Sequence, residues 1–403
     1  MRIALAAPGY PPTLGGVEQV VAQSARALVR AGHEVEVFAQ QRQSAPGSVH
    51  AEAVHAEGAP AESGIAATTM EADSDETGPI KVHRFATHGL HDYPFAPGLW
   101  PALAARAAEF DVVHGHSYHT LTGLSAALGA RAKAPFVFSP HYHGTGHSPP
   151  RTVLHRVYRP LGGYIFRRAD AVVCVSSAEA ELVAEHFPRA AARCTVVPNG
   201  VDRAAIRAAQ PFPSSRPTIL SVGRLERYKR VDRLIEAFAQ LTYPGVRLVV
   251  IGAGPDAERL VELARSLGLL DPNSPRSVRF PGRVAQDVLH RWLRTCRLLC
   301  SFSEHEAFGL APAEALAAGA SVLLSDIPAH RELAACGPVE LVRADEDAQA
   351  LAARLERQLH HHPPPGDGAV VADWDDVAGR LVEVYRSVSS SRPRAGRPPG
   401  AGR

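Results

Sequence analysis

Two glutamates, Glu306 and Glu314, stand with seven residues between them, and Glu306 could bind a hydroxyl-rich molecule. Glu306 precedes Phe308-Gly309 in an expected loop, where a carboxylate and free backbone amides could together hold a polyol. No cationic partner for Glu306 is evident from the sequence. Glu314 falls in the first turn of a short expected helix that ends at Gly319, where the helix dipole stabilises a carboxylate. A purely structural role for Glu314 therefore stays open.

A cluster of four cations follows an expected strand in the segment Gly223-Arg-Leu-Glu-Arg-Tyr-Lys-Arg230. The segment leads into an amphipathic helix, whose first turn already carries partial positive charge. Arg224 and Lys229 are unfavourable there unless an anion binds, so the pattern favours a phosphate site. The alternative is a charged turn that is simply solvated.

A glycine pair, Gly15-Gly16, opens an expected helix directly after the first strand. Backbone amides without a neighbouring side chain can approach phosphate or sugar oxygens. The pair could equally form only a turn.

Histidines gather after two expected strands of the first half of the chain. His141, His143 and His147 follow one of them, and His114 and His116 flank Gly115 after another. The chain holds 20 histidines, so chance placement stays an alternative for each of them.

The five cysteines are scattered and odd in number, which predicts reduced thiols in a cytoplasmic protein. Cys296 and Cys300 could ligate a metal only from a helix. The residues between them predict a buried strand, and a second ligand pair is missing, so no metal is expected.

Strand-like apolar runs alternate with helical periodicity along most of the chain, which predicts an α/β protein with parallel sheets. The expected strands of the first half are Ile3–Ala6, Glu34–Phe38, Lys81–Phe85, Asp111–His114, Pro135–Phe138, Ala171–Val175 and Thr195–Val197. Those of the second half are Thr218–Val222, Arg247–Ile251, Val278–Phe280, Leu298–Ser301, Ser321–Ser325 and Val339–Val342. Ligands of such sheets bind beyond the carboxyl ends of the strands, where the residues above lie.

The pattern restarts after a Pro- and Ser-rich segment, which predicts two Rossmann-like domains, residues 1–205 and 206–370. Residues 40–79 lack periodicity and are expected to be a flexible insertion. A helix is expected over 371–388, and residues 389–403 are expected to be a disordered tail.

Composition excludes several classes of protein. The chain has 403 residues, 45% hydrophobic and 21% charged, so a folded globular protein is expected. Lys and Arg number 43 against 41 Asp and Glu, which gives no general electrostatic case for nucleic acid. We expect neither a signal peptide nor a membrane span.

Several of these motifs together resemble glycosyltransferase family 4. The two glutamates stand in Glu-Ala-Phe-Gly-Leu and Glu-Ala-Leu-Ala-Ala-Gly, similar to the family's E-x7-E motif. Segments 15–18, 197–202, 222–225 with Lys229, and 250–255 occur in the family's order and spacing. The resemblance covers about residues 1–387. It implies the GT-B architecture, two Rossmann-like domains facing across a cleft, with the last helix crossing back to the N-terminal domain.

The resemblance also implies a retaining transfer of a hexose-like sugar from a UDP- or GDP-sugar to a hydroxyl acceptor, without a metal. Arg224 and Lys229 would bind the diphosphate, Glu314 the ribose, and Glu306 with the amides of Phe308 and Gly309 the sugar. The implied donor-binding set is Gly15, Gly16, Arg224, Lys229, Glu306, Phe308, Gly309, Leu310 and Glu314. The implied catalytic set is Glu306, Lys229, Arg224 and His141.

On the acceptor side, the family commonly has a functional histidine after the strand that precedes His141. His143 is the second choice, and His116 could line the same side. The acceptor is left open among a glycan, a lipid and a small molecule. Four arginines in the tail allow a peripheral contact with the membrane inner face, although a solvated terminus explains them as well. A nucleotide-sugar 2-epimerase and a non-enzymic nucleotide-sugar-binding regulator remain alternatives.

Overall fold

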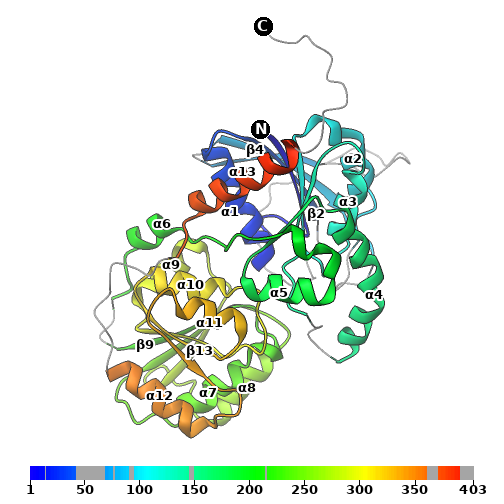
Figure 1. Ribbon diagram of the computed structural model, residues 1–403. Helices are drawn as coiled ribbons and strands as arrows, with labels where there is room; N and C mark the ends of the chain where they lie inside the picture. Colours follow the sequence, from blue (N-terminus) through cyan, green and yellow to red (C-terminus); the bar gives the residue numbers. More distant parts are fainter. Residues whose placement is uncertain are drawn as a thin grey trace.

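The computed structural model describes residues 1–13, 15–41, 69–75, 78–89, 95–144, 149–213, 216–360 and 371–390. They form two lobes, each built on one sheet with helices on both faces (Figure 1). This two-lobed arrangement of Rossmann-like sheets confirms the expected fold class.

The N-terminal lobe holds an eight-stranded sheet of order β3-β4-β2-β1-β5-β6-β7-β8, parallel except for the β3–β4 pair. Its strands are β1 (Arg2–Ala7), β2 (Glu34–Gln41), β3 (Thr69–Asp75), β4 (Gly78–Ala86), β5 (Val112–His116), β6 (Phe136–Ser139), β7 (Ala171–Cys174) and β8 (Cys194–Val196). Its helices are α1 (Gly16–Arg30), α2 (Leu99–Arg106), α3 (Thr122–Gly129), α4 (Pro149–Arg168) and α5 (Ser177–His186), with short 3-10 helices at Ala107–Glu109 and Pro188–Arg193.

The C-terminal lobe holds a six-stranded parallel sheet of order β11-β10-β9-β12-β13-β14. Its strands are β9 (Thr218–Val222), β10 (Arg247–Ile251), β11 (Ser277–Gly282), β12 (Leu298–Ser301), β13 (Ser321–Ser325) and β14 (Val339–Val342). Its helices are α6 (Arg203–Ala208), α7 (Val231–Ala239), α8 (Ala257–Ser266), α9 (Gln286–Thr295), α10 (Leu310–Ala317), α11 (Pro328–Ala334) and α12 (Ala348–His360), with a 3-10 turn at Arg227–Lys229.

The order of each sheet reverses at one point, between β1 and β5 in the first and between β9 and β12 in the second. Loops on either side of such a point diverge to opposite faces and leave room for a ligand at the carboxyl ends of the strands. The glycine pair follows β1 and His116 is the last residue of β5, whereas Lys229 and Glu306 follow β9 and β12.

The last helix, α13 (Trp374–Ser390), returns from the C-terminal lobe and packs against α1 (Figure 1). Leu381 and Tyr385 of α13 join the apolar cluster beneath β1 and β2. The Tyr385 hydroxyl lies 2.7 Å from His114 Nδ1 inside the N-terminal lobe. The crossing expected for the last helix is confirmed.

Two expectations for irregular segments are partly wrong. Gln40 and Gln41 extend β2, and Thr69–Asp75 forms β3, an edge strand antiparallel to β4. A polar edge strand lacks the apolar alternation that identifies buried strands, so this one was mistaken for an insertion. The rest of that segment, residues 42–68, 76 and 77, lies outside the described residues. Helix α13 runs through Ser390, so Ser389 and Ser390 are helical and not part of a tail, and 391–403 lie outside the described residues.

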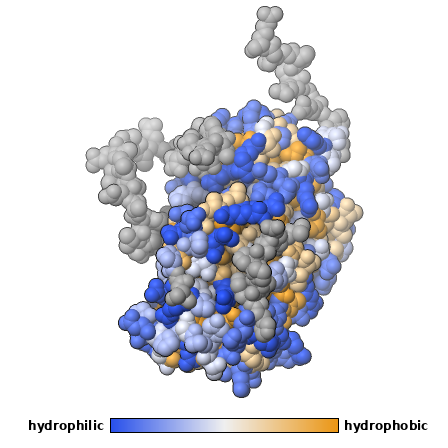
Figure 2. Space-filling view, turned by 90° about the vertical axis from the view of Figure 1, so that its left-hand side faces the viewer, coloured by the Kyte–Doolittle hydropathy of each residue, from blue (hydrophilic) through white to orange (hydrophobic). Residues whose placement is uncertain are grey.

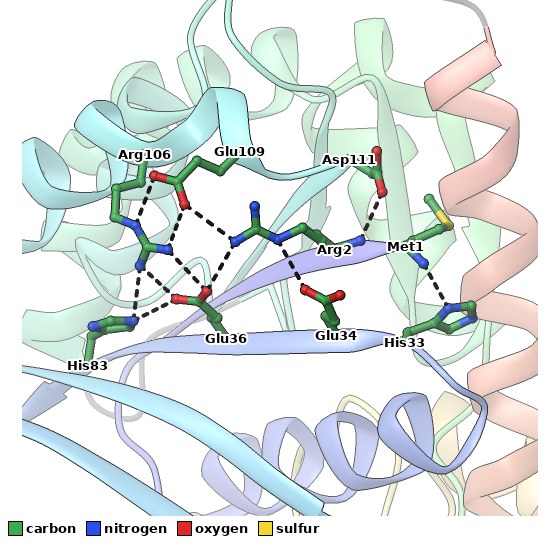
Figure 3. Close-up of polar contacts among 9 residues, drawn as sticks. All are labelled: Met1, Arg2, His33, Glu34, Glu36, His83, Arg106, Glu109 and Asp111. Atoms are coloured by element: carbon green, nitrogen blue, oxygen red, sulfur yellow. Dashed lines mark hydrogen bonds and ion pairs between the residues drawn. The ribbon is translucent and has the colours of Figure 1, made fainter. Parts of the chain in front are cut away.

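An ion network lies at the amino ends of the N-terminal strands, opposite the carboxyl edge (Figure 3). Arg106 Nη1 lies 2.6 Å from Glu36 Oε2, and His83 Nε2 lies 2.8 Å from the same oxygen. Burial opposes ionisation of Glu36, but hydrogen bonds from Arg106 and His83 lower its pKa to about 2. Glu36 is therefore ionised at neutral pH, and the network stabilises this edge.

Candidate active site

Lys229 and Glu306 form a largely buried ion pair at the switch point of the C-terminal sheet. Lys229 ends the 3-10 turn after β9, Glu306 lies in the loop after β12, and Lys229 Nζ contacts Glu306 Oε1. Ser303 Oγ donates to the same carboxylate oxygen at 2.8 Å. The expectation that Glu306 lacks a cationic partner is wrong, because sequence separation hides a contact between two neighbouring strand ends.

Each charge of this pair keeps the other ionised. Burial acts against the charge on Lys229, but Glu306 outweighs it, so the pKa of Lys229 is raised. Burial likewise opposes ionisation of Glu306, but Lys229 outweighs it, so the pKa of Glu306 is lowered. At neutral pH the site holds a full cation beside a full anion.

Other cations of the turn also have carboxylate partners. Arg224 Nε lies 2.8 Å from Glu226 Oε1, and Arg230 Nη1 lies 3.2 Å from Glu304 Oε1. The Arg224 side chain is 54% exposed, so its guanidinium can still reach a ligand. Because these charges are already compensated within the protein, an incoming anion must compete with carboxylates for them.

The loop after Glu306 turns sharply into α10. Gly309 has φ +99° and precedes Leu310, the first residue of the helix, while Phe308 packs partly buried against the core. A Cβ at Gly309 would also lie 3.1 Å from Leu333 Cδ1, so the conformation and the packing both require glycine. The backbone of this loop therefore follows one defined path beside the Glu306 carboxylate.

Glu314 lies in the second turn of α10, not the first, because the helix begins at Leu310. It is buried, and burial raises its pKa to about 8 against a hydrogen bond with Gln286 that lowers it. The helix dipole acts mainly on the first turn, so it does not stabilise the Glu314 carboxylate at this position. A buried carboxyl group that is protonated near neutral pH is common at functional sites.

The glycine pair begins α1 at the carboxyl end of β1. Gly15 has extended backbone, and a Cβ there would lie 2.1 Å from Glu18 Oε2, because the buried Glu18 side chain folds over it. A Cβ at Gly16 would meet nothing within 4 Å, so its backbone is open to approach. In the same first turn, Gln19 Nε2 donates to Gln286 Oε1 of the other lobe at 2.9 Å.

A row of buried histidines lies at the switch point of the N-terminal sheet. His116 Nδ1 lies 3.3 Å from His141 Nε2, and the His114 and His116 rings are 4.2 Å apart. His114 Nε2 also lies 2.9 Å from Ser139 Oγ. Burial lowers the pKa of His141 to about 4, so this ring is neutral at pH 7.

His143 belongs to a different arrangement, which reaches the other lobe. Its ring centroid lies 4.2 Å from that of His119 and 5.0 Å from that of His305. His305 in turn stacks on Tyr228 at 4.3 Å. The three histidines expected on the acceptor side are thus separated: His116 and His141 are in the buried row, and His143 is in a ring stack between the lobes.

The cysteines are placed as structural residues. All five are free, and Cys296 follows α9 while Cys300 lies within β12, so the two do not share a helix. Burial raises the pKa of Cys296 to about 12. Over the described part of the chain, no group of three or more His, Cys, Asp or Glu side chains is arranged to hold a metal ion.

Two family models together match most of the chain. Residues 14–205 match the model "Glycosyltransferase Family 4", and residues 202–365 match "Glycosyl transferases group 1". The chain belongs to glycosyltransferase family 4. Its family and its relatives show that it is a glycosyltransferase.

Curated relatives span the whole length of this glycosyltransferase. The glycogen synthase of Mycobacterium tuberculosis (strain H37Rv) is 27% identical over 421 residues, covering 96% of this chain and 94% of that protein. The phosphatidyl-myo-inositol mannosyltransferase of the same strain is 29% identical over 411 residues, covering 97% and 98%. These relatives are named for different activities, so family membership alone does not assign a substrate.

Solved structures agree with the fold of this glycosyltransferase. The sucrose-phosphate synthase of Thermosynechococcus elongatus matches with a TM-score of 0.72 at 20% identity, covering 97% of this chain and 100% of that chain. Anabaena HepE in complex with UDP-glucose matches with a TM-score of 0.64 at 19% identity, covering 97% and 98%. At these identities the likeness shows the fold.

Contacts between the lobes of this glycosyltransferase involve residues that the sequence did not single out. Ser176 Oγ donates to the Ala307 carbonyl at 2.7 Å, beside Glu306. Glu332 of α11 accepts hydrogen bonds from the Ser177 and Ala178 amides at 2.9 and 2.7 Å, at the start of α5. In the sequence, the one signal that could have indicated a role for Glu332 is its position soon after the buried strand β13.

We expect Glu332→Ala to weaken the contact between the lobes. The change removes both acceptors of the α5 amides, and hydrogen bonds to a charged group contribute about 1.5–3 kcal/mol each, so the contact should weaken at least about tenfold. Small-angle X-ray scattering should show a larger radius of gyration. Arg331→Ala is the matched control, because Arg331 pairs with Asp326 in its own lobe. An unchanged radius in Glu332→Ala would contradict the expectation.

Proposed function

We propose that this glycosyltransferase moves a hexose-like sugar from a UDP- or GDP-sugar to a hydroxyl acceptor, with retention of the anomeric configuration. The observation that carries the proposal is the Lys229–Glu306 pair beside the Gly309 turn, at the carboxyl ends of β9 and β12. A cation for phosphate and a carboxylate for hydroxyl groups lie side by side there. A nucleotide sugar is the co-substrate class that carries both kinds of group.

The donor lies along the carboxyl edge of the C-terminal sheet in this proposal. Arg224 and Lys229 bind the diphosphate, and Glu314 accepts hydrogen bonds from the ribose hydroxyls. Glu306 and the amides of Phe308 and Gly309 hold the sugar. Gly16, whose backbone is open, brings its amide to the distal phosphate from the N-terminal lobe. Direct contacts between the lobes, such as Gln19 to Gln286, support this last role.

The reaction breaks the bond between the anomeric carbon and the diphosphate oxygen, and forms a bond from that carbon to the acceptor hydroxyl oxygen. Negative charge grows on the departing oxygen, where Lys229 and Arg224 stabilise it more in the transition state than in the ground state. The acceptor attacks from the face that the diphosphate leaves, and its proton passes to the leaving phosphate. These cations and amides make a metal ion unnecessary in the proposal.

Donor binding requires an exchange of partners within the site. Lys229 contacts Glu306, so the diphosphate must draw Lys229 away from the carboxylate. The Glu306 carboxylate can then accept hydrogen bonds from sugar hydroxyls. Its hydrogen bond from Ser303, which is 2.8 Å long, keeps the carboxylate in position. One ion pair is thus replaced by a cation–phosphate contact and a carboxylate–hydroxyl contact.

The acceptor side of the site belongs to the N-terminal lobe in this proposal. The neutral His141 ring can accept a hydrogen bond from an acceptor hydroxyl, and His143 lies at the lobe boundary.

Within the described residues, no helix is long and apolar enough to cross a bilayer. Figure 2 shows hydrophilic and hydrophobic residues mixed over one face of the molecule, and the exposed large apolar side chains are Phe95, Trp100, Leu161 and Leu267.

A panel of nucleotide sugars tests the proposed function. The purified protein is incubated with each donor, without acceptor and with candidate hydroxyl acceptors, and the released nucleoside diphosphate is measured. Release that depends on the acceptor, with the product keeping the anomeric configuration of the donor, supports the proposal. Conversion of the donor sugar without release, or no release and no binding with any donor, contradicts it.

The protonation of Glu314 gives the donor affinity an expected pH dependence. Ribose hydroxyls donate to the carboxylate form, so binding lowers the Glu314 pKa from its value of about 8 in the protein alone. Affinity therefore rises with pH up to about 8, by up to about tenfold per unit, and is level above it. Calorimetric titration with a nucleotide sugar between pH 6 and 8.5 measures this slope. Glu314→Gln should abolish it, and a slope that persists in that variant would refute the assignment.

A further inference from the structure

His330 of α11 is a fully buried histidine whose ring orientation is well defined. Its Nδ1 lies 2.9 Å from the Ser325 carbonyl oxygen and 3.2 Å from Ser325 Oγ. A carbonyl oxygen only accepts hydrogen bonds, so Nδ1 carries the proton. Burial also lowers the pKa of His330, which keeps the ring neutral. Nε2 is therefore a bare hydrogen-bond acceptor.

That acceptor has no donor within the described residues. His330 Nε2 is buried and makes no hydrogen bond there. An unsatisfied buried acceptor destabilises the folded protein, and such atoms in native structures call for an explanation. The cost is removed as soon as a ligand supplies an O–H or N–H group.

The bare nitrogen lies at the sugar-holding loop of the proposed donor site. His330 Nε2 would be 3.7 Å from a Cβ at Gly309, so the ring edge lies directly against that turn. The ring is also close enough to Glu306 for the carboxylate to act on the His330 pKa. Ser325 connects the two, because its hydroxyl donates to the Ser303 carbonyl at 2.5 Å and Ser303 holds Glu306.

We propose that His330 is a specificity-determining residue for the donor sugar, and that its Nε2 accepts a hydrogen bond from one hydroxyl of the transferred sugar. The inference rests on the proposed function and adds a second acceptor to the Glu306 carboxylate. The Ser325–Ser303 connection holds both acceptors in one rigid network, so a sugar is favoured when its hydroxyls reach both. A site built to bind a hydroxyl group rejects an analogue that lacks it, since the buried partner is then left unsatisfied.

Two matched substitutions separate this role from simple packing. In His330→Asn the side-chain amide reaches the position of Nδ1, so the contact with Ser325 can persist while the Nε2 acceptor is lost. In His330→Gln the amide reaches the position of Nε2 and keeps an acceptor there. The glutamine also fills nearly the same volume, so the test remains available if the asparagine variant does not fold.

The experiment compares two ligands by calorimetry: the best nucleotide sugar from the donor panel and its nucleoside diphosphate. We expect His330→Asn to weaken binding of the nucleotide sugar about tenfold and to leave the diphosphate within about twofold, with His330→Gln in between. A series of monodeoxy donors should contain one member that wild type and His330→Asn bind equally. That member identifies the hydroxyl group that His330 accepts.

Different outcomes would contradict the inference about His330 and the proposed function on which it rests. Equal loss for the nucleotide sugar and the diphosphate, or the same ratio between wild type and variant for every monodeoxy donor, would show that His330 only supports the loop. Unchanged affinity for the sugar would show that water or a loop amide satisfies Nε2. If wild type binds no nucleotide sugar, the proposed function fails, and the inference fails with it.

Discussion

Lys229→Ala should lower kcat/KM for sugar transfer by about 10²- to 10³-fold. Lys229 is the largely buried cation at the position where charge develops on the departing diphosphate, and one lost stabilising group of this kind costs about that factor. The loss should fall mainly on kcat, because the contact strengthens in the transition state. Initial rates of diphosphate release at varied donor concentration measure both parameters.

Arg227→Ala is the matched control for Lys229. Arg227 belongs to the same 3-10 turn, but its side chain is 79% exposed and lies 3.8 Å from Asp256. Its removal takes away the same charge and should change kcat/KM less than about twofold, because solvent screens an exposed cation. If both variants lose activity equally, the cluster acts by general attraction, and the assignment of Lys229 is wrong.

Glu306→Gln should bind nucleoside diphosphate about tenfold more tightly than wild type, and yet transfer sugar about 10²-fold more slowly. The Glu306 carboxylate forms an ion pair with Lys229. The Gln substitution removes this pair, so Lys229 can bind phosphate without the cost of breaking it. Transfer slows because the sugar loses its charged hydrogen-bond acceptor. Calorimetry with the diphosphate and initial rates with the donor provide the two measurements.

Glu304→Gln separates this effect from a general change in charge. Glu304 lies two residues away, is 54% exposed, and pairs with Arg230 at 3.2 Å. Its neutralisation should change both quantities less than about twofold. Weaker diphosphate binding in Glu306→Gln would mean that the carboxylate organises the phosphate site and does not compete with it.

The buried strands were predictable from sequence because their chemistry is local. Thr218–Val222, Leu298–Ser301 and Ser321–Ser325 were placed with their observed ends, since a short apolar run between turns is typical of a parallel strand covered on both faces. Thr69–Asp75 was missed because its polar residues lack the apolar run that identifies a buried strand, although its backbone pairs with β4.

The candidate site was predictable in its members but not in its pairing. Glu306 and Lys229 were located from strand ends and the resemblance to the family, yet their ion pair joins residues 77 positions apart. Only the strand order, with β9 next to β12, brings them together. His330 could not be found from the sequence for a related reason, because its proposed role rests on a nitrogen that has no hydrogen-bond partner among the described residues.

The ring stack between the lobes offers a label-free measure of domain motion. His143 of the N-terminal lobe and His305 of the C-terminal lobe have ring centroids 5.0 Å apart, and Tyr228 stacks on His305 at 4.3 Å. Aromatic rings at this distance shift each other's proton resonances through their ring currents, an effect that vanishes within a few ångströms of separation. The carbon-bound ring protons of these two histidines would therefore act as a built-in NMR gauge of how the lobes open and close in solution.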